Sequence, residues 1–164
     1  MADVFGAKKR SEVMSRIRGK DNKSTELALA SAFRQSGITG WRRHLSIKLK
    51  LKLAVGPQPK PIAGAKVLIV RPDFVFRSER VAIFVDGCFW HRCPLHSQVP
   101  ESNRVFWEAK LARNVERDRL VSRELKKAGW RVIRVWEHAL STNRGRATRR
   151  VVAALATRRS SDME

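Results

Sequence analysis

The run from Asp86 to His96 constrains the fold of this chain more than any other part of the sequence. These eleven residues hold both cysteines and two of the four histidines. Cys88, Cys93 and His96 have the spacing Cys-x4-Cys-x2-His, which is typical of ligands to a bound metal ion. A loop that binds a metal at both ends presents the aromatic residues between its ligands, which indicates a nucleic-acid-binding protein.

A structural zinc site would need a fourth ligand in addition to these three, because tetrahedral zinc takes four protein ligands. The best candidate is His138, just beyond a strand predicted at 130–135. If that strand runs beside the one predicted at 81–85, His138 returns to the loop. His44 is a weaker candidate for the fourth position. The alternative is that both cysteines are simply small buried residues.

The charge of the chain indicates a polyanionic partner. Thirty-five Lys and Arg residues against fifteen Asp and Glu give a net charge of +20, and basic side chains bind phosphate backbones by releasing condensed counterions. The 164 residues suffice for one domain. Apolar runs are too short to span a membrane, and the first residues do not resemble a signal peptide. We therefore expect a cytoplasmic protein. The cytoplasm is reducing, so the two cysteines are expected to bind a metal rather than form a disulfide.

Sequence patterns predict an α/β fold with a mixed sheet. A turn at 78–80 makes the strands around it a hairpin, and the prolines and glycines of 54–66 predict a loop. Residues 1–158 are expected to form the domain and 159–164 a flexible tail. The predicted helices are 8–17, 24–36, 103–128 and 147–158, and the predicted strands are 41–53, 67–70, 73–76, 81–85 and 130–135.

A second set of residues could form a carboxylate site. Asp73 begins one strand of the predicted hairpin and Asp86 ends the other, so both could converge with His91 and Glu26. Carboxylates can hold Mg²⁺ against a phosphate, and a histidine can act as general base towards water. Each residue also has an ordinary explanation: Asp73 could cap a turn, Glu26 could favour a helix N-terminus, and His91 could lie on the surface.

These motifs together resemble the very-short-patch repair endonucleases, bacterial enzymes that nick DNA beside a T:G mismatch. The resemblance covers most of the chain. It is carried by Arg10-Ser11-x-x-Met14, Glu26, Arg71-Pro72-Asp73-Phe74-Val75-Phe76, Ile83-Phe84-Val85-Asp86-Gly87-Cys88-Phe89-Trp90-His91, Phe106-Trp107, Lys110, Asn114-Val115-Glu116-Arg117-Asp118, Gly129-Trp130-Arg131-Val132 and Val135-Trp136-Glu137.

The resemblance implies a restriction-endonuclease-like domain, with a central mixed sheet flanked by helices and a structural zinc loop. It implies that Asp73 binds Mg²⁺ with help from the main-chain carbonyl of Val85. His91 would be the general base, with Glu26 held nearby. Supporting residues would lie one turn apart on the long helix, at Asn114 and Asp118.

The same resemblance assigns four residues to DNA intercalation. Phe89, Trp90 and Trp107 match the aromatics that the family inserts into the base stack, and Met14 matches a residue that reaches the DNA from the other groove. An inserted wedge prefers mismatched sites because unstacking costs less there. The alternative for Trp107 is a core position beside Phe106.

Three features depart from the best-known family pattern. Cys93, His96 and His138 would replace a histidine-rich ligand loop and a later cysteine, a change that zinc tolerates. Asp86 replaces a histidine, and either adds a carboxylate near the metal or alters DNA contact. Residues 45–66 look like an insertion, which is either a hairpin that contacts DNA or a disordered segment.

The function implied is Mg²⁺-dependent nicking of double-stranded DNA beside a T:G mismatch. A DNA cytosine methyltransferase is the expected genomic companion, and other mismatch-repair proteins are candidate partners. We expect a monomer, associated with the bacterial nucleoid, with residues 1–23 as an arm that contacts DNA. Two other hypotheses remain: a restriction or defence nuclease without mismatch preference, and a non-catalytic zinc module that binds nucleic acid.

Overall fold

A computed structural model of the chain describes residues 26–51 and 67–161. Several sequence predictions fall outside these residues: the helix at 8–17, the arm at 1–23, Met14, and the loop at 54–66. None of the helices in the described part is both long and apolar enough to cross a membrane.

A four-stranded mixed sheet forms the centre of the fold, in the order β1-β4-β5-β6. β4 (Phe74–Phe76) and β5 (Val81–Asp86) form the predicted antiparallel hairpin, and β1 (Trp41–Arg43) pairs antiparallel with β4. β6 (Arg131–Trp136) runs parallel to β5, with Asp86 opposite Trp136. The mixed α/β architecture is therefore confirmed, and the ends of β5 and β6 lie side by side.

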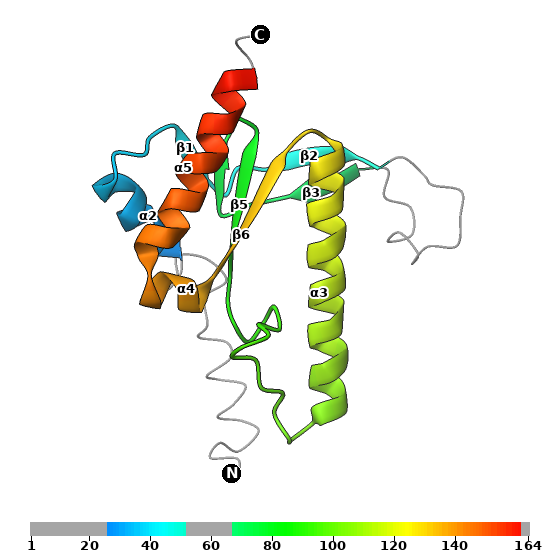
Figure 1. The fold of residues 1–164 in the computed structure, drawn as a ribbon. Helices are drawn as coiled ribbons and strands as arrows, with labels where there is room; N and C mark the ends of the chain where they lie inside the picture. Colours follow the sequence, from blue (N-terminus) through cyan, green and yellow to red (C-terminus); the bar gives the residue numbers. More distant parts are fainter. Residues whose placement is uncertain (1–25, 52–66, 162–164) are drawn as a thin grey trace.

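Helices cover one face of this sheet. α2 (Glu26–Gln35), α4 (Glu137–Thr142) and α5 (Arg144–Ser161) lie together on one side (Figure 1). Their apolar side chains pack on those of the central strands, and the largest buried ones include Phe33, Phe74, Phe76 and Ile83. Phe33 meets Phe74 edge to face, with the ring centroids 5.3 Å apart.

The opposite face is covered by the long helix α3 (Arg104–Lys127) and by a separate two-stranded sheet (Figure 1). β2 (Ile47–Lys50) and β3 (Val67–Val70) form this sheet in antiparallel register. Its inner side chains join those of Val75, Ala82, Val121 and Leu125 in a second core. α3 also connects β5 to β6, as a parallel pair of strands requires.

The single strand predicted at 41–53 is wrong, because the chain changes sheets within it. His44 adopts a left-handed backbone (φ 53°) between β1 and β2, and this turn sends the two strands to different sheets. The predicted lysine face is correct, since Ile47 and Leu49 are buried while Lys48 and Lys50, which alternate with them, are exposed. Helix α4 was not predicted, and the last helix begins at Arg144 and ends at Ser161 rather than spanning 147–158.

Candidate functional site

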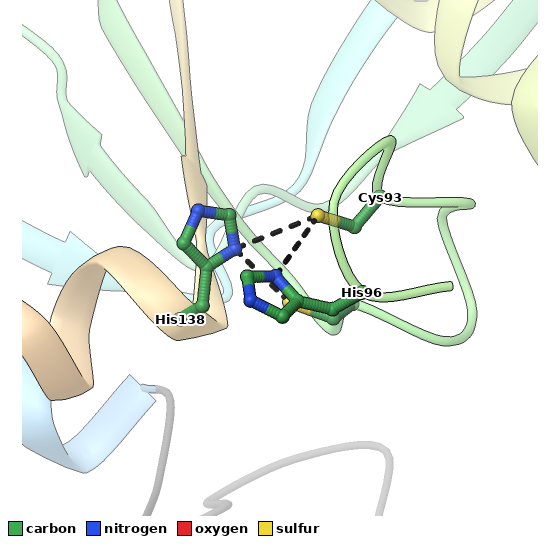
Figure 2. A group of neighbouring side chains, drawn as sticks. Cys93, His96 and His138 are labelled. Atoms are coloured by element: carbon green, nitrogen blue, oxygen red, sulfur yellow. Dashed lines mark hydrogen bonds between the residues drawn. The ribbon is translucent and has the colours of Figure 1, made fainter. Parts of the chain in front are cut away.

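The two cysteines and two histidines of the predicted metal site come together beside the end of β5. Cys88 Sγ lies 3.2 Å from His138 Nδ1, and Cys93 Sγ lies 3.5 Å from the same nitrogen. Cys93 Sγ lies 3.6 Å from His96 Nδ1 (Figure 2). All four ligand atoms lie within 4.8 Å of one another. The structure therefore places His138 beside the other three candidate ligands, and His44 lies elsewhere.

The spacing of these atoms fits a tetrahedral metal ion. Metal–sulfur bonds of about 2.3 Å and metal–nitrogen bonds of about 2.0 Å place a tetrahedral sulfur–nitrogen pair about 3.5 Å apart. Burial and the neighbouring Cys93 raise the pKa of the Cys88 thiol, although the backbone N–H of His138 lowers it. A bound cation would offset the cost of placing two thiolates together, so the donor set suits a soft or borderline metal.

A second group that could hold a cation lies where β1 meets β4. Ligand atoms of Glu26, His44 and Asp73 lie within 4.8 Å of one another. His44 Nε2 lies 3.1 Å from Glu26 Oε2, which also accepts a hydrogen bond from Arg43 Nη2 at 2.8 Å. The backbone N–H of Val85 donates to Asp73 Oδ2 at 2.7 Å. Sequence reasoning missed His44 here because β1 was not recognised as ending beside Asp73.

Asp73 is held in a setting that disfavours its charge. Its pKa is raised to about 6, mainly by burial; the charges of Glu26 and Asp86 also raise the pKa, while the hydrogen bond from the Val85 N–H and the charge of His91 lower it. Two carboxylates close together in a partly buried site, with Asp86 adding to the negative potential, favour an added cation. The electrostatics of the group therefore match its capacity to hold a divalent metal.

His91 is paired with an acid on α3. Its Nδ1 lies 2.5 Å from Asp118 Oδ2; with the proton on Nδ1 donating to this carboxylate, the neutral ring carries its lone pair on Nε2. Asn114, one turn earlier on the helix, donates from Nδ2 to the carbonyl of Trp90 at 3.0 Å. Both predicted helix residues thus contact the loop that carries His91. An imidazole oriented by a carboxylate is the arrangement of a general base.

Asp86 was expected to converge with Asp73, Glu26 and His91. Its Oδ1 lies 3.8 Å from His91 Nδ1, but it is not part of the group formed by Glu26, His44 and Asp73. It is only 2% exposed, and Arg134 donates to both of its carboxylate oxygens at 2.6 Å. Arg134 also lies 2.9 Å from Asp118 Oδ1. The acids therefore divide into two groups, one with His44 and one with Arg134 and His91. Sequence reasoning did not identify Arg134.

One aromatic cluster lies between the loop and α3. Its members are Phe89, Trp90, Phe106 and Trp107. Phe89 lies 5.1 Å from Trp90 and 5.4 Å from Trp107, measured between ring centroids. Trp107 is 7% exposed and packs on Phe106, which is 53% exposed. Phe89 and Trp90 are partly buried. Trp107 has the core environment that was the alternative for it, and its role in intercalation stays a prediction.

A groove of about 600 Å³ opens between α3 and β6 next to His91. His91, Asp118 and Arg134 line one part of it, and four basic residues of α3 line another part. These are Arg119, Arg123, Lys126 and Lys127. Their charge suits a phosphate backbone.

Known proteins resemble the chain across this site. The sequence profile of the family "DNA mismatch endonuclease Vsr" matches residues 63–96. The DNA mismatch endonuclease Vsr of Escherichia coli (strain K12) is 38% identical over 142 residues, covering 85% of this chain and 76% of the relative. The Type II nicking enzyme V.NmeAIP of Neisseria meningitidis serogroup A is 33% identical over 84% of this chain and 83% of its own length. The Type II nicking enzyme V.NaeI of Lentzea aerocolonigenes is 59% identical, over 42% of each chain.

The charge penalty on Asp73 predicts how a neutral substitute behaves. Asp73→Asn should raise the melting temperature in magnesium-free buffer at about pH 8 and change it little at about pH 3.5, where the carboxyl is protonated in both states. A raised pKa means that the folded protein binds this proton more tightly between 3.8 and about 6, so the wild type loses stability as the pH rises through that window. Circular-dichroism melts at both pH values measure the effect. Parallel pH dependence in the two proteins would contradict it.

Proposed function

Because the chain belongs to the family of the DNA mismatch endonuclease Vsr, we propose that it nicks one strand of DNA beside a T:G mismatch by Mg²⁺-dependent hydrolysis. The observation that carries this proposal is the pairing of two groups at one end of the sheet. Asp73 belongs to a group that could hold a cation, and the charge of His91 acts on Asp73, so this group lies near the pair of His91 and Asp118.

The residues that would hold Mg²⁺ are Asp73 and the main-chain carbonyl of Val85, with Glu26 and His44 beside them. The donor set fits, because Mg²⁺ prefers oxygen ligands and keeps several waters. A bound Mg²⁺ stabilises the charge that develops on the phosphate and on the leaving oxygen.

His91 would take the proton from the attacking water at Nε2. Asp118 accepts the Nδ1–H and stabilises the imidazolium that forms. Asn114 fixes the backbone at Trp90, immediately before His91. These residues activate the water, and the basic groove beside them provides a path for the phosphate backbone.

Mismatch preference would come from the aromatic cluster. Phe89, Trp90 and Trp107 pack edge to face or tilted against one another at the N-terminal end of α3 and would form the wedge. Inserting such a wedge costs a few kcal/mol of unstacking, and less at a mispaired step. Met14, the fourth proposed intercalator, lies outside the described residues.

The cluster of Cys88, Cys93, His96 and His138 would hold structural zinc. Four protein ligands leave no open position for water, so the ion would stabilise the loop rather than react. The proposal also includes a monomer in the bacterial cytoplasm and nucleoid. A DNA cytosine methyltransferase is its genomic companion, and mismatch-repair proteins are candidate partners.

A second candidate uses the same site. Several relatives are named Type II nicking enzymes, which favours a nicking endonuclease of a restriction or defence system that does not depend on a mismatch. A third, a non-catalytic zinc module that binds nucleic acid, would leave the ordered His91–Asp118 pair without a use.

Asp73→Ala should abolish nicking, by about a thousandfold or more, while the Kd for DNA changes by less than about threefold. The substitution removes a charge from the metal site and not from the phosphate-facing groove. Glu116→Ala, at an exposed acid of α3, is the matched control and should retain both properties. Gel nicking and fluorescence anisotropy measure the two effects. Parallel loss of binding and cutting would assign Asp73 to DNA contact.

Matched duplexes that differ in a single T:G or C:G pair test the mismatch preference. We expect single-strand cleavage next to the T only with the mismatch and Mg²⁺, and none in EDTA. Equal nicking of the C:G duplex would establish the second candidate. Tight, salt-sensitive binding without cleavage, in protein of verified metal content, would establish the non-catalytic module.

Cys88→Ser should lower the stability of the whole fold, because metal binding is coupled to folding. We expect a loss of about 3 kcal/mol, or about 10 °C in Tm, together with loss of zinc measured by mass spectrometry. Leu95→Ala, which alters a 73%-exposed residue of the same loop, should keep both zinc and Tm. Full stability in zinc-free Cys88→Ser protein would refute structural zinc.

A further inference from the structure

We propose that Arg134 is a positioning residue, which fixes Asp118 and through it the ring of His91. The inference rests on the proposed function for its catalytic consequence, but its structural content can be tested without any substrate. It gives a role to a strand arginine that the sequence patterns did not single out.

The guanidinium of Arg134 is held at several points. Nε and Nη2 each donate to Asp86 at 2.6 Å, in a fork that matches the carboxylate. The carbon of the guanidinium lies 5.1 Å above the ring of Phe84. Nη1 lies 3.5 Å from Ser122 Oγ. A side chain held in this way has little freedom to rotate.

Arg134 in turn restrains His91 through the carboxylate of Asp118. Its Nη2 lies 2.9 Å from Asp118 Oδ1, while the other oxygen of the same carboxylate accepts the His91 Nδ1–H. Asp118 is therefore held on both oxygens and cannot turn without losing one partner. Because the carboxylate is fixed, the imidazole presents Nε2 in one direction.

Asp86 has a separate part in this chain of contacts. A buried carboxylate is costly unless it is paired, and the guanidinium occupies both of its oxygens. Asp86 therefore anchors Arg134 and is not free to bind the cation near Asp73. The contacts run from β5 through β6 and α3 to the loop that carries His91.

The charges of Arg134, Asp118 and His91 favour the same arrangement of side chains. Burial alone would raise the pKa of Asp118, but the hydrogen bond from His91 and the charge of Arg134 lower it overall. Asp118 therefore stays ionised and keeps its acceptor towards the imidazole. A lysine in place of Arg134 would keep the positive charge and lose the planar fork, so it could not hold both acids in the same geometry.

Arg134→Lys separates position from charge. We expect kcat for nicking to fall by about tenfold or more, with the Kd for DNA changed by less than about twofold. Arg131→Lys is the matched control, because Arg131 lies on the same strand and donates to the carbonyl of Ala154 on α5, and it should keep wild-type kcat. Unchanged kcat in folded Arg134→Lys protein, or a loss confined to binding, would overturn the proposal.

A double-mutant cycle shows whether Arg134 acts through Asp118. In an Asp118→Asn background, Arg134→Lys should cost less than about twofold further in kcat. Independent, multiplicative losses would overturn the proposal. If Arg134→Lys does not fold, the pair Asp86→Asn with Arg134→Gln takes its place, because it removes both buried charges together.

Proton NMR of the metal-loaded protein tests the geometry without DNA. The Nδ1–H of His91, assigned by its loss in His91→Gln, should give one downfield resonance in the wild type and in Arg131→Lys. It should broaden or split in Arg134→Lys. An unchanged resonance would overturn the positioning role even if the substrate differs from a T:G mismatch, whereas failure of the mismatch assay alone would leave this result standing.

Discussion

The parallel pairing of β5 with β6 is the constraint on which the rest of the site depends. Its register places Asp86 opposite Trp136, so the segments that follow the two strands leave the sheet side by side. Cys88 and His138, which lie fifty positions apart in the sequence, meet for this reason. The same pairing brings Arg134 to Asp86. A one-residue shift in this register would place these side chains on opposite faces and break both groups together.

A chain with a net charge of +20 concentrates its few buried acids in a small volume. Basic partners or a cation must compensate each of them, because an unpaired buried carboxylate costs several kcal/mol. Arg134 compensates Asp86 and Asp118, and Arg43 contacts Glu26. The negative charge of Asp73 is compensated less by its neighbours, and the raised pKa of this carboxyl reflects the difference. The residue that would bind the metal is therefore the one whose charge the protein itself stabilises least.

The patterns that the sequence revealed were those set by local spacing. The hairpin of β4 and β5, the long helix, and the cysteine–histidine loop follow from alternation, apolar runs and ligand intervals that are close in the chain. The expected pairing of β6 with β5 was enough to predict that His138 lies beside the cysteine–histidine loop. His44 and Arg134 were missed because their roles depend on contacts between distant elements. A left-handed turn at His44 and a charge pair across two strands leave no periodic pattern.

The loop after β5 combines the proposed metal ligands with the proposed general base, and this arrangement has a mechanical reason. Cys88 and Cys93 enclose Phe89, Trp90 and His91, a half-buried segment that belongs to neither of the two core clusters. A metal held at both ends of that segment would limit its motion, while Asn114 and Asp118 hold its middle from α3. Productive geometry tolerates only about 0.5 Å of error, so a loop can carry a general base only when its neighbours restrain it. Loss of the metal would displace His91 and the aromatic wedge together, because one short segment carries both.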